Sequence, residues 1–424
     1  MLQYLGINIK QENQKFYPLA IHYLLAIVIF ITLVFGKAFT KYAILPNIYL
    51  HDTIILLLCL LGLNKGKIMI RNPEVLIIIA LSFIYLIISF LFFRDKPEFY
   101  FKMAIRQYGL FIYLAFAYIL FNTFYRTKYD IESLLRFIIW IGKVSYFLTW
   151  AKILFILFIL HSDTQFEFRF YSYIAVLGVI TYSSYTLLYK KGINKYLIYL
   201  SCLILSLLTK QAAFFLSEVI IGLSYFFFRI KVAHRITFLV IGLICIGLLF
   251  LAPDFTDVNV KWRLLYWRHI LANAADNYYL FGNGFGMPYM TADYSYYLQN
   301  KIQSNIMTPE FNPLARHISP PHNSFLTIIF HIGLLPFFLL LWPIRRIFNL
   351  LFIKPFSNDK VLYFLSLTLI GSIVWCSFNV ILELPHSAVY FWLIFFTTAF
   401  HLRKEFTPTR FIVKSKIPNQ DETT

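Results

Sequence analysis

The sequence predicts an all-α polytopic membrane protein of about twelve transmembrane helices with one long external loop that holds short helices. Hydrophobic residues make up 59% of the 424 residues and charged residues only 14%, whereas soluble globular proteins carry roughly 25% charged residues. Apolar runs long enough to span a bilayer recur along the chain. A water-soluble core cannot absorb so many runs of this length, so membrane helices are indicated.

Twelve apolar segments are expected to cross the membrane. In chain order they are Ala20–Gly36, Tyr49–Leu63, Val75–Phe93, Gln107–Phe124, Phe137–Leu160, Tyr171–Tyr189, Tyr196–Thr209, Ala212–Phe228, Ile236–Ala252, Asn323–Trp342, Val361–Leu382 and Ala388–Phe400. The chain therefore divides into nine helices over 1–252, a long polar loop over 253–322, three closing helices over 323–402 and a basic tail over 403–424.

The distribution of basic residues predicts the orientation. Most of the 38 Lys and Arg residues fall in the two termini and in the short connections on the same side as the termini, and cytoplasmic segments carry this excess. We therefore expect both termini in the cytoplasm and the long loop outside, in a bacterial inner (cytoplasmic) membrane. Nucleotides are absent on that side, so chemistry in the loop requires a substrate that is already activated and delivered by the membrane.

Several other classes are disfavoured. The net charge of +18 is spread over connections between spans, and no basic, aromatic-rich soluble domain exists to bind nucleic acid. The four cysteines lie in apolar spans without CxxC spacing, and no His, Cys and Asp cluster has metal-ligand spacing. We expect no disulfide framework, no metal and no cofactor.

Two basic residues outside the long loop stand at the predicted outer surface. Lys210 lies between the seventh and eighth segments, with Glu218 two helical turns later. A buried Lys–Glu pair or a lysine reaching to the interface explains it equally well. Arg169 lies in the short loop HSDTQFEFRFYS, where a contact with lipid headgroups is the simpler interpretation.

The first third of the long loop, NVKWRLLYWRHILANAADN, has the pattern of a basic helix. Trp267 follows Arg263 by four residues, and Leu264 and Leu271 continue a predicted apolar face. Such a helix either lies in the membrane interface or, through Arg263 and Arg268, clamps a diphosphate, for which the planar guanidinium is suited.

The rest of the loop contains a glycine turn and a histidine. Gly282, Gly284 and Gly286 alternate in NYYLFGNGFGM, which permits close backbone approach but matches no nucleotide-binding loop. The loop ends at His322, where two prolines set an extended approach to the tenth segment. A histidine there either caps a helix or acts as a general base. Arg316 lies a few residues earlier and is a further candidate for phosphate contact.

Together these residues resemble the O-antigen ligase and polymerase family of bacterial surface-glycan assembly. The arginine-tryptophan helix leads into a Leu-x-Gly-x-Gly turn, as in that family. In HNSFLTIIFHIGLL, His322, Asn323, Leu326 and Gly333 match a His-Asn-x-x-Leu element followed by a glycine. The closing pair of spans, joined by ELPHS, agrees as well.

The resemblance implies a metal-independent, inverting glycosyltransferase. Its donor is a glycan linked through diphosphate to undecaprenyl lipid. Its acceptor is a hydroxyl of the lipid A core or of another lipid-linked repeat unit, with a chain-length regulator as a possible partner. By the same resemblance His322 deprotonates or orients the acceptor hydroxyl, Arg263 holds the diphosphate, Arg169 contacts phosphate, and Asn323 and the three glycines support the site.

One departure from the family lies at its Ser/Thr-Arg pair. This chain reads Thr209, Lys210 and Gln211 there, so the family arginine is replaced by Lys210 or by Gln211. A lysine keeps the charge without the bidentate fork.

A polytopic transporter or flippase of lipid-linked glycan is the alternative function, because ionisable groups at membrane depth mark transport pathways too. The lack of an internal repeat speaks against it.

Overall fold

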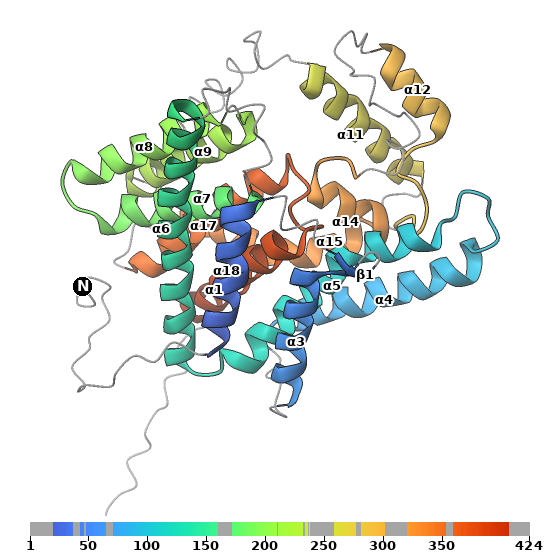
Figure 1. The fold of residues 1–424 in the computed structure, drawn as a ribbon, viewed down its shortest axis with the longest axis horizontal. Coiled ribbons are helices and arrows are strands. Elements are labelled where there is room, and N and C mark those ends of the chain that lie inside the picture. Colours follow the sequence, from blue (N-terminus) through green and yellow to red (C-terminus); the bar gives the residue numbers. More distant parts are fainter. Residues whose placement is uncertain are drawn as a thin grey trace, which may run out of the picture.

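The computed structural model describes residues 20–36, 43–45, 48–64, 71–159, 172–209, 211–231, 234–235, 237, 258–276, 281–301, 320–352 and 359–406. Over these ranges the chain is helical apart from one short hairpin (Figure 1). The helices are α1 (Ala20–Phe35), α3 (Leu50–Asn64), α4 (Pro73–Phe93), α5 (Phe101–Phe124), α6 (Lys128–Phe158), α7 (Tyr173–Tyr189), α8 (Asn194–Leu208), α9 (Ala212–Arg229), α11 (Val258–Asp276), α12 (Ala292–Lys301), α14 (Ser324–Ile332), α15 (Leu334–Leu340), α16 (Trp342–Phe352), α17 (Lys360–Cys376) and α18 (Pro385–Phe406). The hairpin pairs β1 (Ala43–Leu45) with β2 (Ile48–Tyr49) in antiparallel fashion, and the all-α fold class is confirmed.

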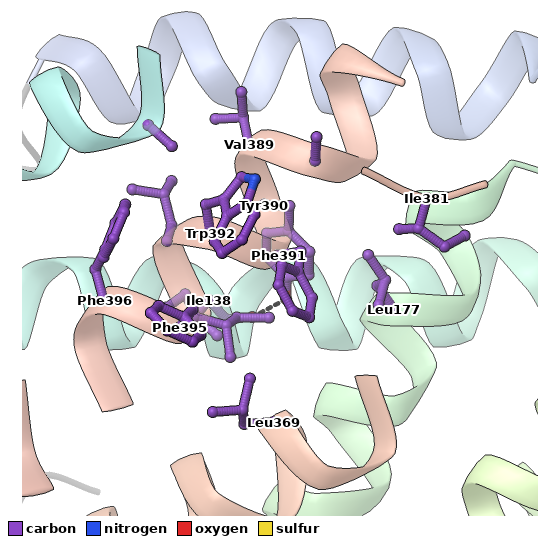
Figure 2. Packing of buried hydrophobic residues seen from close by; sticks show 14 of the residues in the cluster. Ile138, Leu177, Leu369, Ile381, Val389, Tyr390, Phe391, Trp392, Phe395 and Phe396 are labelled. Carbon is purple, nitrogen blue, oxygen red and sulfur yellow. Dashed lines mark hydrogen bonds between the residues drawn. The ribbon is translucent and has the colours of Figure 1, made fainter. Parts of the chain in front are cut away.

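Helix α18 lies at the centre of the bundle and packs against α5, α7 and α17. Its side chains from Ala388 to Ala399 are buried on every face, as expected of a helix that is apolar all round. Figure 2 shows them in contact with Ile138, Leu177 and Leu369. The polar tip of Tyr390 is also satisfied, because its hydroxyl donates to the carbonyl of Ile138 at 3.2 Å.

The outer helices present apolar side chains to their surroundings. In α4 the exposed side chains include Ile77, Phe83 and Leu91, which water would penalise and lipid tolerates. Among the described residues, α4, α5, α6 and α9 are long and apolar enough to cross a membrane, and five shorter helices are apolar. The chain is therefore a multi-pass membrane protein, while the number of twelve spans stays a prediction.

Nine of the predicted segments coincide with a described helix to within a few residues at most of their ends. The ninth, Ile236–Ala252, lies almost wholly outside the described residues. The eleventh was expected to reach Leu382, but α17 ends at Cys376 and a turn follows. The tenth, Asn323–Trp342, is not one helix, because the backbone breaks at Gly333 between α14 and α15.

The break at Gly333 has a physical cause. Gly333 adopts φ 84°, a left-handed conformation that favours glycine. The carbonyls of Phe330 and His331 then accept hydrogen bonds from the backbone N–H groups of Asn283 at 2.7 Å and Gly284 at 3.1 Å. The helix ends there because its last carbonyls are satisfied by the glycine turn of the long loop.

The two loop helices α11 and α12 lie together at one end of the molecule, beside α14 (Figure 1). The face of α11 toward α14 consists of Trp262, Tyr266 and Ile270. Leu264 and Leu271, predicted to form the apolar face, are instead 56% and 40% exposed. The prediction chose the wrong face because the large aromatic side chains, and not the leucines, fill the space above α14.

Candidate active site

The glycine turn is bound to the broken helix through His331. Its Nδ1 lies 2.7 Å from the carbonyl oxygen of Gly284 and its Nε2 lies 3.0 Å from the Tyr289 hydroxyl. Because a carbonyl only accepts, Nδ1 carries the proton and Nε2 accepts from Tyr289. The imidazole also stacks on Phe285 at 4.7 Å. His331 thus holds the loop in place.

Helices α4 and α5 hold the other side of the glycine turn. Ser89 Oγ accepts from the backbone N–H of Phe285 at 2.8 Å. Gln107 accepts from the N–H of Gly286 at 2.7 Å and donates to the carbonyl of Met287 at 2.8 Å. Gly284 and Gly286 have φ 73° and 86°. The alternating glycines therefore allow the backbone of the turn to pack closely against the helices.

Helix α11 fixes the segment that leads into His322. The Trp267 indole N–H donates to the carbonyl of Pro321 at 2.6 Å, and the Trp262 ring meets the His322 ring edge-on at 5.6 Å between centroids. Arg263 follows Trp262 and precedes Trp267 by one helical turn. The structure thereby brings the arginine helix and the histidine end of the loop together, although they are far apart in sequence.

His322 itself has a left-handed backbone with φ 53°, which is found at no other non-glycine residue of the described ranges. This conformation costs about 1 kcal/mol or more in an L-residue, and such strain gathers at functional sites. The N-cap of α14 is Asn323, whose side-chain oxygen accepts from the N–H groups of Phe325 and Leu326 at 3.1 Å each. The capping role that sequence left open for His322 thus falls to its neighbour.

His269, the histidine of α11, packs against the neighbouring helix α12. The ring of His269 stacks on Tyr294 of α12 at 3.8 Å, and its Nε2 lies 3.2 Å from the amide of Asn273. Burial lowers the pKa of His269, so the neutral form is favoured. The His269 ring therefore joins α11 to α12, whereas His322 lies directly before the N-cap of α14.

The turn between α17 and α18 adds an acidic residue to the same region. Ser324, the first residue of α14, donates to Glu383 Oε2 at 2.7 Å. Glu383 and Arg263 both interact electrostatically with the Tyr173 hydroxyl at the start of α7. Arg263 is partly buried, whereas Arg268 is exposed on another face of α11.

Three predicted phosphate-contacting residues, Arg169, Lys210 and Arg316, lie outside the described residues. Sequence reasoning missed Glu383, Ser324 and Tyr173. The signal for Glu383 was present as the acidic residue of ELPHS, two positions before the proline that begins α18. Among the described residues no three His, Cys, Asp or Glu side chains are grouped to hold a metal ion.

The fold and these contacts define a multi-pass membrane protein in which a polar loop joins an arginine helix to a histidine at the mouth of a broken helix. The family model described as O-antigen ligase matches residues 196–341. This stretch includes Arg263, the glycine turn and His322, and over it the predicted resemblance to the O-antigen ligase and polymerase family is confirmed. No curated protein matches the chain.

Proposed function

We propose that the protein is a metal-independent, inverting glycosyltransferase that moves a glycan from a lipid diphosphate donor to an acceptor hydroxyl on the periplasmic side. The family match supports a glycan-transferring role in surface polysaccharide assembly. The observation that carries the proposal is the junction of α11 with the segment before His322, made by Trp267 and Trp262. This junction holds the basic helix α11 and the imidazole of His322 close to the start of α14.

Arg263 is the proposed partner of the donor diphosphate. Arg263 is partly buried, in a region where charges act over a lower dielectric than in water. A fixed cation stabilises the charge that develops on the leaving diphosphate in the transition state. Arg169, Lys210, Arg268 and Arg316 are proposed as further phosphate contacts. With cations in this role, the reaction needs no metal.

His322 is the proposed group that deprotonates or orients the acceptor hydroxyl. The acceptor oxygen forms a bond to the anomeric carbon, and the bond from that carbon to the diphosphate oxygen breaks on the opposite face. A single displacement of this kind inverts the anomeric centre. The strained backbone of His322 and the cap provided by Asn323 fix the position of the imidazole at the helix entrance.

The donor that fits this chemistry is an undecaprenyl-diphosphate-linked glycan, which carries its own activation across the membrane. The acceptor is either the lipid A core, as for a ligase, or the sugar end of a second lipid-linked repeat unit, as for a polymerase acting with a chain-length regulator. In this proposal the region 253–322 is the periplasmic loop of an inner-membrane protein whose termini are cytoplasmic.

Transfer by purified protein tests the proposal. The protein in detergent is mixed with a lipid-diphosphate oligosaccharide and either lipid A core or a second portion of the same donor, in the presence of a chelator and without nucleotide. We expect a longer or core-linked glycan and release of lipid diphosphate. Absence of a new glycosidic bond with both acceptors, together with gradient-dependent movement of donor in vesicles, would instead identify a transporter.

A further inference from the structure

The turn between α17 and α18 is fastened to the residue two positions after His322. The Ser324 hydroxyl oxygen accepts from the backbone N–H groups of Ile381 at 2.9 Å and Leu382 at 3.1 Å. It lies 2.7 Å from Glu383 Oε2 and 3.1 Å from the carbonyl of Asn379. One serine therefore sets the position of the Glu383 carboxyl relative to the beginning of α14.

The second oxygen of this carboxyl has no such partner. Glu383 Oε1 is buried and accepts no hydrogen bond from any described residue. The nearby Thr327 hydroxyl donates to the carbonyl of Asn323 at 3.1 Å, so its proton is already used. A buried carboxylate oxygen without a donor is costly. The position is what a hydrogen-bond donor on a bound substrate would complete.

We propose that Glu383 contacts the acceptor sugar and that Oε1 receives the proton of the reacting hydroxyl. The acceptor O–H bond breaks, the proton moves to Oε1, and the oxygen bonds to the anomeric carbon while the diphosphate leaves with its electron pair. In this arrangement His322 orients the acceptor and does not take its proton. This inference rests on the proposed transfer reaction and assigns its proton acceptor.

The groups around Glu383 fit this role. Burial raises the pKa of the Glu383 carboxyl to about 7, against the lowering effect of nearby polar groups, of which the Ser324 hydroxyl has the largest effect. A base with a pKa near the working pH combines availability with proton affinity. Among the described residues, Tyr173, Tyr289 and Cys376 interact electrostatically with Glu383, and the Arg263 and Arg106 charges act on Tyr173 and Tyr289 respectively.

The Tyr289 hydroxyl is unsuited to accept the proton of the reacting hydroxyl. Burial, together with the nearby Glu383 charge, raises the Tyr289 pKa well above its usual value, and its hydroxyl contacts His331. Arg263 is the proposed diphosphate contact. Among these described groups, the carboxyl is the one able to take a proton near neutral pH.

Glu383→Gln tests the proposal in the transfer assay, because the amide keeps the size and a hydrogen-bond-accepting oxygen but cannot take the proton. We expect kcat to fall by at least about 100-fold while the KM for donor stays within a few-fold. Glu383→Asp should recover part of this rate. The matched control is Glu218→Gln, which removes a buried carboxyl of α9 and should retain wild-type activity.

The pH profile separates a proton acceptor from a structural residue. Wild-type kcat/KM should rise about tenfold per pH unit below pH 7 and level off above it, and this rise should vanish in the residual activity of Glu383→Gln. Wild-type kcat in Glu383→Gln would overturn the assignment. A flat wild-type profile between pH 5.5 and 8.5 would overturn it as well, and this second measurement does not depend on whether the variant folds. Wild-type protein without transfer would instead refute the proposed function, and this inference with it.

Discussion

The Trp267 indole N–H donates to the carbonyl of Pro321 at 2.6 Å, and this bond joins the helix of Arg263 to the residue before His322. Trp267→Phe keeps the ring but removes the donor. Since a hydrogen bond of this kind contributes about 1 kcal/mol, we expect transfer to slow by about fivefold through misplacement of His322. Initial rates and thermal unfolding of the variant measure both effects. Trp140→Phe, at a 42% exposed position of α6, should change neither.

Arg263→Lys should weaken transfer by about 10- to 100-fold, because lysine keeps the charge but loses the fork that holds two phosphate oxygens. The effect should appear in kcat/KM for the lipid-linked donor. Arg94→Lys is the matched control, since Arg94 is exposed and pairs only loosely with Asp95. Equal activity of the wild type and Arg263→Lys would remove Arg263 from the diphosphate site.

Gly282→Ala should prevent the glycine turn from docking on the broken helix. A Cβ at residue 282 would lie 2.2 Å from the backbone carbonyl carbon and oxygen of His331. Backbone cannot move aside cheaply, so a loss on the order of 3 kcal/mol or more is expected. Yield of monodisperse protein and its unfolding midpoint are the readouts. Gly109→Ala, with its nearest neighbours at 3.7 Å, should behave as wild type.

Glu383 also predicts how stability depends on pH. Its carboxyl has an ordinary pKa of 4.5 and a folded-state pKa of about 7, so the folded state keeps a proton that the unfolded state releases. The stabilisation from this proton is complete below about pH 4.5 and is lost as the pH rises through about 7, a change of about 3 kcal/mol. The unfolding midpoint of the wild type should fall between pH 5 and 8 more than that of Glu383→Gln. Parallel curves for the two proteins would contradict the raised pKa.

Much of the helical framework could be predicted from sequence because apolar runs such as Val75–Phe93 need no tertiary context to be recognised. The break at Gly333 could not be predicted in this way. It depends on carbonyls of Phe330 and His331 that bind the N–H groups of Asn283 and Gly284, a contact between distant segments. Glycine and proline within the run allowed a break but did not require one.

The parts of the candidate site that form local sequence patterns could be predicted, and the parts that depend on contacts between distant segments could not. His322 and the α11 helix were recognisable as local patterns, and the structure joins them through Trp262 and Trp267. Glu383 was overlooked because its importance comes from Ser324, which is 59 positions away. The buried face of α11 was misjudged because helical spacing alone did not decide between the leucines and the aromatic residues.

In the proposed mechanism His322 acts directly in glycan transfer. The most direct measurement compares wild type and His322→Ala, both purified in detergent, for transfer from a lipid-diphosphate glycan to an acceptor hydroxyl. We predict loss of at least about 100-fold in rate, with an unchanged unfolding midpoint, since the cap of α14 belongs to Asn323. A well-folded His322→Ala protein that transfers glycan at the wild-type rate would contradict the claim.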